Sequence, residues 1–300
     1  MTDSKQILIT GGTGFIGSHL SQYLVAQGYL VTLLSRTLNV KRNPSQGITV
    51  TTSLATLNND DWYGIINLAG EPLNRSRWSA AQKNRIIDSR ISVTRTLNSW
   101  IRTLKVPPKV YISGSAIGYY GHWDNELIDE DSLCREGFSN LLCKSWEAAA
   151  NEVADLPIRR CVIRIGIVLG NDGGSLPALL LPAKLGLGGP MGGGSQWWSW
   201  IHVQDLVRSC KLLLEDPEAQ GAFNLTAPNP VTQAEFARIL GKQLNRPAIM
   251  PLPAFMMKLL VGEFADEVLL RGQRVLPSHL LKRRFTFAYP NLALALSELL

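Results

Sequence analysis

The sequence predicts an α/β protein: a doubly wound parallel sheet of the Rossmann type with a smaller C-terminal substrate lobe. Apolar runs of strand length alternate with segments of helical periodicity up to residue 170, which is typical of repeated βα units. The first apolar run ends in a glycine cluster, TGGTGFIG. Beyond residue 170 the chain becomes rich in glycine and proline. We therefore expect a sheet domain from 1–170 plus 199–226 and a substrate-binding lobe from 171–198 plus 227–300.

Each element has its own pattern. The first half gives the strand KQILIT, the helix FIGSHLSQYLVAQG, the strands YLVTLLS, ITVTT and YGIINLA, a helix at 79–104, the strand KVYISGS, a helix at 138–153 and the strand IRRCVIRIGIVLG. The second half gives loops in GGSLPALLLPAKLGLGGPMGGGSQWW, the strand SWIHV, the helix DLVRSCKLLLED, the strand GAFNLTA, the helix TQAEFARILGKQL and short helices in AFMMKLLVGEF and LALALSELL. This order predicts a parallel sheet covered on both faces.

The composition excludes two classes of function. The net charge of +6 is spread along the chain without a basic stripe, so no nucleic-acid partner is expected. The longest apolar segment is interrupted by Pro182 and Lys184, so no membrane helix is expected. The four cysteines lack metal-binding spacing, which predicts no metal site and no disulfide framework. With only MTDSKQ before the first strand, we expect no leader and a cytoplasmic location.

The glycine cluster predicts a dinucleotide site. Gly12-Thr13-Gly14-Phe15-Ile16-Gly17 is a G-x-G-x-x-G between a strand and a helix, preceded by Gly11. Glycines let the backbone approach a diphosphate, and the helix N-terminus offers it free N–H groups. The second strand ends in Ser35-Arg36 instead of the acidic residue that selects NAD. Because a guanidinium can bind a 2′-phosphate, the cofactor should be NADP(H).

Four segments together resemble the extended short-chain dehydrogenase/reductases: TGGTGFIG, NLAG at 67–70, SGSAIGYYG at 113–121 and GGGSQWWSWIHVQDL at 192–206. More narrowly, NLAGE, LLCKSWEAAA, RIGIVLG, LGLGGPMGGG and LRGQRVLP resemble the branch called epimerase family proteins, described as NADP-dependent sugar-nucleotide epimerases without a settled substrate. The resemblance implies cofactor contacts from Leu68, Ala69 and Gly70, from Arg90 at the phosphates and from Val168 near the nicotinamide. Packing alone would also explain Leu68, Ala69 and Val168, and a surface ion pair would explain Arg90.

The catalytic residues are harder to identify. In the superfamily a tyrosine and a lysine, spaced Y-x-x-x-K on one helix, transfer the proton that accompanies hydride transfer. Here those positions read Asn140 and Lys144, and an amide cannot act as the base. Ser115 matches the residue that orients the substrate, and Tyr119 or Tyr120 is the candidate proton donor or acceptor. The alternatives are that Tyr119 packs against the sheet end and that Lys144 is simply exposed.

The lobe supplies candidate substrate contacts near the mouth of the cleft: Gln196, Trp197, Trp200 and His202, with Trp198 beside them. Aromatic planes suit stacking on a base or sugar, yet the tryptophans could equally form an apolar plug and His202 a structural contact. Asp205 is explained as a helix N-cap.

Two functions follow. One is an NADP-dependent oxidoreductase or epimerase acting on a small polar, nucleotide-sugar-like substrate. The other is a non-catalytic NADP(H)-binding sensor or scaffold protein that has lost the catalytic tyrosine.

Overall fold

The protein is built around one parallel sheet. The computed structural model describes residues 5–38, 46–57 and 61–300. In this part of the chain the main sheet has seven strands in the order β11-β7-β5-β4-β1-β2-β3, and every neighbouring pair is parallel. The strands are β1 (Gln6–Thr10), β2 (Leu30–Leu34), β3 (Ile48–Thr51), β4 (Trp62–Asn67), β5 (Val110–Ala116), β7 (Arg159–Ile165) and β11 (Gly221–Leu225). The predicted fold class is confirmed.

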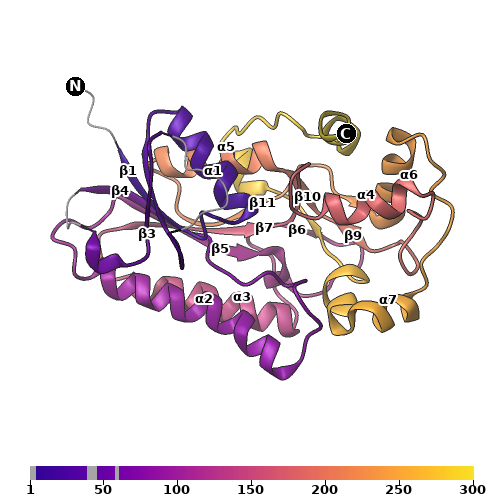
Figure 1. Ribbon diagram of the computed structural model, residues 1–300, viewed down its shortest axis with the longest axis horizontal. Helices are drawn as coiled ribbons and strands as arrows, with labels where there is room; N and C mark the ends of the chain where they lie inside the picture. Colours follow the sequence, from indigo (N-terminus) through magenta and orange to yellow (C-terminus); the bar gives the residue numbers. More distant parts are fainter. Residues whose placement is uncertain (1–4, 39–45, 58–60) are drawn as a thin grey trace.

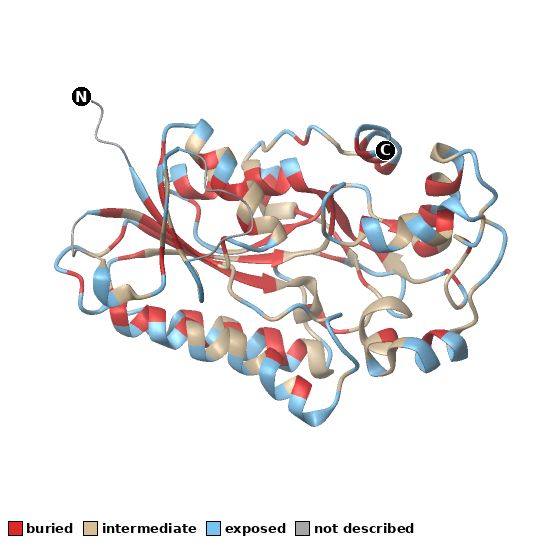
Figure 2. Cartoon of the chain, viewed as in Figure 1, coloured by how far each residue is buried: buried red, intermediate tan, exposed pale blue. Residues whose placement is uncertain are grey.

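Helices cover both faces of this sheet (Figure 1). On one face lie α1 (Phe15–Ala26) and α5 (Val203–Glu215), and on the other lie α2 (Ala80–Ile101) and α3 (Phe138–Ala150). The strands are apolar and buried from both sides, as parallel strands must be, with Ile7, Leu8 and Ile9 at 0% exposure. Figure 2 shows the burial concentrated in the strands, while the outward faces of α2 and α7 (Ala254–Val261) are exposed.

The helix ends follow local chemistry. Ser79 caps α2 by accepting a hydrogen bond from the Gln82 amide, so the helix begins at Ala80, and it ends three residues before the predicted limit. α3 ends at Ala150 and continues as one 3₁₀ turn, Asn151–Val153. Short 3₁₀ turns also occupy Leu54–Thr56 and Ile117–Tyr120, the latter directly after β5.

The predicted strand IRRCVIRIGIVLG is two strands. β7 stays in the main sheet, while β8 (Ile167–Leu169) pairs with β10 (Trp200–His202). The break falls at Gly166, where a Cβ would lie 2.4 Å from the Ser199 carbonyl oxygen, so only glycine permits this close approach. α5 begins at Val203, capped by the His202 side chain and not by Asp205.

The lobe contains more regular structure than its composition predicts. The segment expected as loops contains the helix α4 (Leu176–Lys184), which has a proline in its first turn and another at Pro182. Further elements are β9 (Trp197–Trp198), β12 (Val231–Thr232), α6 (Gln233–Gln243), a π-helix at Ala265–Leu269, β13 (Arg274–Val275) paired with β6 (Leu127–Ile128), α8 (Ser278–Lys282) and α9 (Leu292–Leu299). Within the described ranges, each helix is too short or too polar to cross a lipid bilayer.

Candidate cofactor and catalytic site

The turn between β1 and α1 leaves no room for side chains at three glycines. A Cβ on Gly11, whose φ is +69°, would lie 2.4 Å from the Leu68 carbonyl oxygen. A Cβ on Gly17 would lie 2.3 Å from the Gly11 carbonyl oxygen, and one on Gly12 would meet Leu33 at 2.4 Å. These glycines allow the turn to pack against its own helix and against the loop after β4.

Gly14 differs from these three. Its nearest neighbour for an added Cβ is the Gly11 carbonyl oxygen at 3.2 Å, and both Thr13 and Gly14 are exposed. Gly14 is the N-cap of α1, so no side chain caps this end, and the first turn carries no acidic residue. The N–H groups of the first turn have no intrahelical partner, and the helix dipole adds a partial positive charge. This end of α1 therefore fits an anion such as a diphosphate.

The loop 68–70 is fixed beside the turn by buried polar groups. Asn67 is fully buried, accepts a hydrogen bond from Thr10 Oγ1 at 2.6 Å and donates one to Thr94 Oγ1 at 2.8 Å. The Ala69 amide donates to the same Asn67 oxygen at 3.3 Å. Leu68 packs against the core beneath the sheet edge. The two loops that should flank a dinucleotide are thus held side by side.

Arg90 lies behind this loop on α2. Its guanidinium donates to the Ile86 and Glu71 carbonyl oxygens at 3.0 and 3.2 Å and lies over the Trp146 ring at 5.2 Å. A Cβ on Gly70 would meet it at 3.0 Å. Burial lowers the pKa of Arg90, and within the described ranges no carboxylate forms an ion pair with it. A half-buried cation of this kind suits the cofactor phosphates that the resemblance assigns to it.

Ser35 and Arg36 follow the end of β2. The Ser35 amide continues the sheet by donating to the Thr51 carbonyl oxygen, and the Arg36 side chain is exposed. Phe15 and Ile16 pack on the core, and Phe15 is covered by the glycines of the 170–174 loop. Val168 is buried in the same core, 7% exposed, so it is a packing residue as well as a candidate contact.

Ser115 is committed to a buried ion pair. Its hydroxyl donates to Glu147 Oε1 at 2.7 Å, and the same carboxylate binds Arg164 through two hydrogen bonds of 3.0 Å. Burial alone would lower the pKa of Arg164, but the hydrogen bond and charge of Glu147 outweigh it and raise the pKa. Ser113, two residues earlier on β5, is also buried.

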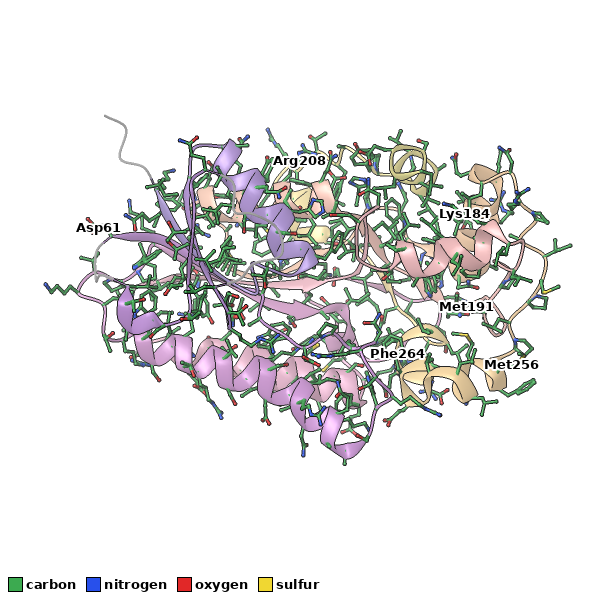
Figure 3. All side chains as sticks on the ribbon, viewed as in Figure 1. Asp61, Lys184, Met191, Arg208, Met256 and Phe264 are labelled. Atoms are coloured by element: carbon green, nitrogen blue, oxygen red, sulfur yellow. The ribbon has the colours of Figure 1, made fainter. Side chains whose placement is uncertain are left out.

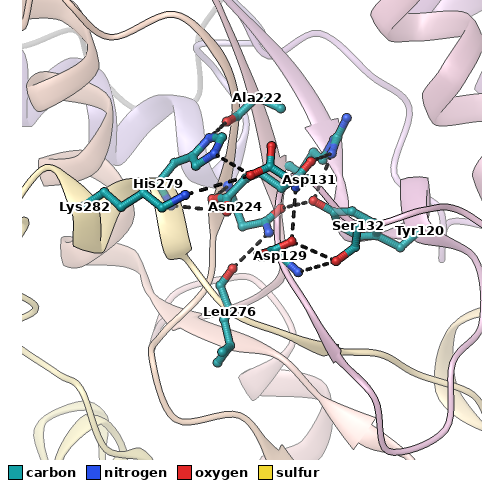
Figure 4. A network of polar contacts seen from close by, with 11 residues as sticks. Tyr120, Asp129, Asp131, Ser132, Ala222, Asn224, Leu276, His279 and Lys282 are labelled. Atoms are coloured by element: carbon teal, nitrogen blue, oxygen red, sulfur yellow. Dashed lines mark hydrogen bonds and ion pairs between the residues drawn. The ribbon is translucent and has the colours of Figure 1, made fainter.

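Tyr120 belongs to a polar network between the sheet and the C-terminal tail (Figure 4). Its fully buried phenol donates to Asn224 Oδ1 at 2.7 Å and accepts from Arg164 at 2.9 Å. Burial raises the pKa of Tyr120 to about 12. The Asn224 side-chain amide donates a hydrogen bond to the Leu276 carbonyl oxygen. The Glu130 carboxylate accepts hydrogen bonds from the backbone amides of Asn224 and His279. Burial also raises the pKa of Glu130.

Tyr119 and Lys144 line a groove of about 460 Å³ between α3 and strands β7 and β11. None of the residues of the glycine turn lines this groove. The Arg164 guanidinium lies 3.5 Å over the Tyr119 ring. Lys144 is exposed, and the neighbouring Cys134 raises the pKa of its ammonium group. The structure therefore does not bring Lys144 to the glycine turn.

The face of α3 turned towards Ser115 and Arg90 carries Ser139 and Cys143. A Cβ on Gly118 would lie 3.0 Å from Ser139 Cβ and 3.8 Å from Cys143 Sγ. The Cys143 thiol lies close to Ser115, the Ala116 backbone and Arg90, and burial raises its pKa to about 11. Asn140 is on another face, where its amide donates to the Tyr119 carbonyl oxygen and so holds the loop after β5.

Sequence reasoning missed two residues next to Ser139. Ser139 donates to Glu267 Oε2 at 3.1 Å, and His122 Nε2 lies 3.3 Å from the same oxygen. Glu267 sits in the π-helix of the lobe and His122 in the loop after β5. GEFADEV gives no motif, and the one available signal was that His122 follows the strand end where superfamily chemistry gathers.

The expected substrate residues divide into two pairs. Gln196 donates to the Met191 and Leu269 carbonyl oxygens, both within the lobe, whereas Trp197 donates to Asn125 of the sheet half and lies against the Arg274 guanidinium. Trp200 is fully buried in the lobe core. His202 is fully buried too: it caps α5, contacts Glu298 at 2.9 Å and stacks on Tyr289.

Asp205 does not cap the helix. It accepts hydrogen bonds from the Ala288 and Tyr289 amides at 2.9 and 2.8 Å and so anchors the tail. Among the residues described, no cluster of three or more His, Cys, Asp or Glu could hold a metal ion, and Cys134, Cys143, Cys161 and Cys210 are free thiols.

Comparisons with known proteins agree with this architecture. Residues 7–226 match the model of the NAD dependent epimerase/dehydratase family, and residues 252–299 match a domain of unknown function, DUF1731. The bovine (Bos taurus) epimerase family protein SDR39U1 is 39% identical over 302 residues, covering 98% of this chain and 99% of that protein.

Solved structures extend the comparison. The crystal structure of human epimerase family protein SDR39U1 (isoform 2) with NADPH is 36% identical, covers 98% of both chains and superposes with a TM-score of 0.90. UDP-N-acetylglucosamine 4-epimerase from Methanobrevibacter ruminantium, 19% identical with a TM-score of 0.79 over 99% of this chain and 97% of that one, shows the shared fold. The family model covers residues 7–226, which include the glycine turn and residues of all seven strands of the main sheet. This chain therefore belongs to the NAD dependent epimerase/dehydratase family.

Proposed function

We propose that the chain is an NADP(H)-dependent oxidoreductase or epimerase that acts by hydride transfer on a small polar substrate of the nucleotide-sugar type. The observation that carries this proposal is the anion cradle: the uncapped N-terminus of α1, the open backbone at Gly14, and Arg90 half-buried without an ion-pair partner among the described residues. The human relative crystallised with NADPH supports the choice of cofactor.

In this proposal the diphosphate rests on the backbone from Gly11 to Gly17. Arg36 binds the 2′-phosphate, with the Ser35 hydroxyl beside it, because no acidic side chain at the end of β2 would repel it. Leu68, Ala69 and Gly70 flank the adenosine, Arg90 balances the phosphate charge and Val168 borders the nicotinamide. The bound cofactor supplies the hydride, and the protein supplies position, charge and a route for the proton.

The substrate would lie between the sheet domain (1–170 plus 199–226) and the lobe (171–198 plus 227–300). Trp197 reaches from the lobe to Asn125 of the sheet half, with Gln196 next to it, whereas Trp200 and His202 are fully buried. Ser115 would orient the substrate oxygen, Tyr119 or Tyr120 would exchange its proton, and Lys144 would bind hydroxyl groups. Ser115 and Tyr120 are already hydrogen-bonded to Glu147 and Asn224. Variants at these two positions therefore test whether either residue also takes part in the reaction.

The test measures binding and turnover separately. Calorimetry with NADPH and NADH measures binding first, and the absorbance of the reduced nicotinamide then follows reaction with carbonyl compounds and nucleotide sugars. Tyr119→Phe and Tyr120→Phe are compared with the wild type. We expect micromolar or tighter NADPH binding, weaker NADH binding and turnover with at least one substrate. Absence of heat with NADPH would remove the proposal altogether.

A second function is favoured by one specific observation. The candidate catalytic groups are engaged elsewhere: Ser115 with Glu147, Tyr120 with Asn224 and Asn140 with a backbone carbonyl oxygen. That arrangement also fits a non-catalytic NADP(H)-binding sensor or scaffold protein. Tight NADPH binding with no turnover of any substrate in the screen would select this second function.

A further inference from the structure

The proton-transfer group need not come from the face of α3 that the Y-x-x-x-K spacing selects. The face turned towards Ser115 and Arg90 carries Ser139 and Cys143, one turn apart. A serine hydroxyl and a buried thiol are poor proton donors and acceptors near neutral pH. If this site performs hydride transfer, the group that titrates in the working range must come from a neighbouring segment.

A candidate pair lies next to Ser139. His122, in the loop after β5, and Glu267, in the π-helix of the lobe, form an ion pair of 3.3 Å whose side chains are only 17% and 16% exposed. The Ser139 hydroxyl donates to the same Glu267 oxygen at 3.1 Å. Three segments far apart in the sequence therefore converge at the start of α3. π-helical turns of this kind recur at functional sites.

Aromatic side chains pack together beside this cluster. Trp78 packs edge-on against Phe138 at 5.0 Å and against Phe264 at 5.8 Å. The labelled Phe264 lies in Figure 3 where the lobe meets the helices α2 and α3. A Cβ on Gly137 would lie 3.7 Å from Glu267 and 4.0 Å from His122, so the residue before α3 packs directly against this pair. The cluster lies where the π-helix of the lobe meets the loop after β5 and the start of α3.

His122 Nδ1 is buried without a hydrogen-bond partner within the described part of the chain, whereas the buried Nε2 faces the Glu267 carboxylate at 3.3 Å. Buried polar atoms in this state call for an explanation, and a catalytic role is among the few available. Lys83 and Glu263 already form an ion pair of 2.6 Å between α2 and the lobe. The His122–Glu267 pair is therefore not needed solely to hold the lobe against the sheet half. Arg135, the other cation next to His122, bonds its carbonyl oxygen and not its ring.

Glu267 is equipped to orient the imidazole. The hydrogen bond from His122 holds the pKa of this carboxyl at about 2, so the carboxylate is ionised throughout the physiological range. A carboxylate that fixes a histidine ring and stabilises its protonated form is the arrangement that catalytic histidines use.

We propose that His122, in place of Tyr119 or Tyr120, exchanges the proton with the substrate oxygen. Glu267 orients His122, and Ser139 is a second hydrogen-bond partner of that carboxylate. This inference rests on the proposed hydride transfer. In the reducing direction the carbonyl carbon receives the hydride from the nicotinamide, and the carbonyl π electrons move to oxygen. That oxygen then takes the proton from His122. The products are an alcohol and the oxidised cofactor, and water returns a proton to His122.

The first experiment needs no substrate. The chain has four histidines, so the imidazole signals of ¹⁵N-labelled protein can be assigned with one His→Gln variant each. Oxidation of NADPH to NADP⁺ places a positive charge on the nicotinamide. We expect the His122 signals to differ between the two complexes and those of His279 to stay unchanged. Unchanged His122 signals with NADPH bound would overturn this inference and leave the proposed function standing, whereas failure to bind NADPH would overturn both.

The second experiment measures turnover of 9,10-phenanthrenequinone, a carbonyl probe, with NADPH. We expect His122→Gln to lower kcat about 100-fold at unchanged KM for NADPH. Glu267→Gln should lower kcat by about 10-fold. The matched controls, His279→Gln and the surface variant Glu152→Gln, should retain wild-type kcat. Equal kcat in His122→Gln and wild type, or no turnover by a wild type that binds NADPH, would overturn the assignment.

Discussion

The β1–α1 turn and the β5–α3 corner are the two halves of the proposed site, and they are built differently. In the turn, the backbone itself forms the surface, since Gly11 and Gly17 leave less than 2.5 Å for a Cβ. At the corner, side chains form the surface, and the face of α3 that points inwards carries Ser139 and Cys143 instead of Asn140 and Lys144. A site made of backbone tolerates almost no substitution, whereas a site made of side chains can change its chemistry.

The largest expected effect breaks the turn itself. In Gly17→Ala the new Cβ would meet main-chain atoms at 2.3 and 2.6 Å, so we expect a loss of at least about 3 kcal/mol in the free energy of unfolding. In Gly14→Ala the new Cβ would meet only the Gly11 carbonyl oxygen, at 3.2 Å. Its free energy of unfolding should therefore lie within about 1 kcal/mol of the wild-type value. It should still bind NADPH about 100-fold more weakly, because its methyl group stands where the diphosphate approaches. Urea unfolding and calorimetry measure both, and wild-type affinity in Gly14→Ala would contradict the placement of the diphosphate.

The next effect separates two neighbouring residues of α3. Glu147→Ala leaves the buried Arg164 without its carboxylate, and we expect a loss of about 3 kcal/mol in the free energy of unfolding. Lys144→Ala, one turn earlier and exposed, should change it by less than about 0.5 kcal/mol. Urea unfolding of the two variants decides, and comparable losses would show that Lys144 is held more firmly than its exposure suggests.

A smaller effect concerns cofactor selection at the end of β2. Arg36→Ala should weaken NADPH binding by about 30-fold, near 2 kcal/mol, since a charge-assisted hydrogen bond to the 2′-phosphate is lost. NADH lacks that phosphate, so its affinity should not change. Titration calorimetry with both cofactors measures the difference, with Arg95→Ala, a surface ion-pair residue, as the control. Equal weakening of NADH and NADPH would contradict the assignment.

The smallest effect is a pH dependence at the corner. Because the folded pKa of Glu267 is about 2, below its value of about 4.3 in an unfolded chain, its contribution to stability is complete above that unfolded value. It is lost as the pH falls towards 2. We expect Glu267→Gln to be less stable than the wild type by about 1 kcal/mol at pH 6, with the difference shrinking at pH 3. A difference that stays constant between these two pH values would show that the His122 pair is not responsible.

The sequence predicted the turn because its requirement is a residue type at a fixed spacing. Any chain that places G-x-G-x-x-G between a buried strand and a helix must bring the glycine backbone to the helix end, whatever the rest of the fold does. The sheet followed for a similar reason, since parallel strands buried on both faces are apolar along their whole length.

The corner could not be predicted in the same way, because α3 buries polar side chains beside its apolar ones. Leu141 is 59% exposed, whereas Asn140 is fully buried and Glu147 is half-buried, and both bond to residues far away in the sequence. Glu267 lies in a π-helix that the pattern of GEFADEV does not indicate. α4 was missed because its prolines suggested a loop, although a proline in the first turn is well tolerated.

The contacts of residues 279–298 with the rest of the protein affect how the chain folds during synthesis. Glu130 finds its amide partners at Asn224 and His279, Asp205 finds its own at Ala288 and Tyr289, and His202 meets Glu298. Until residues 279–298 have been synthesised, Glu130, Asp205 and His202 lack these partners. The nascent chain should therefore become resistant to protease only after this segment has emerged from the ribosome.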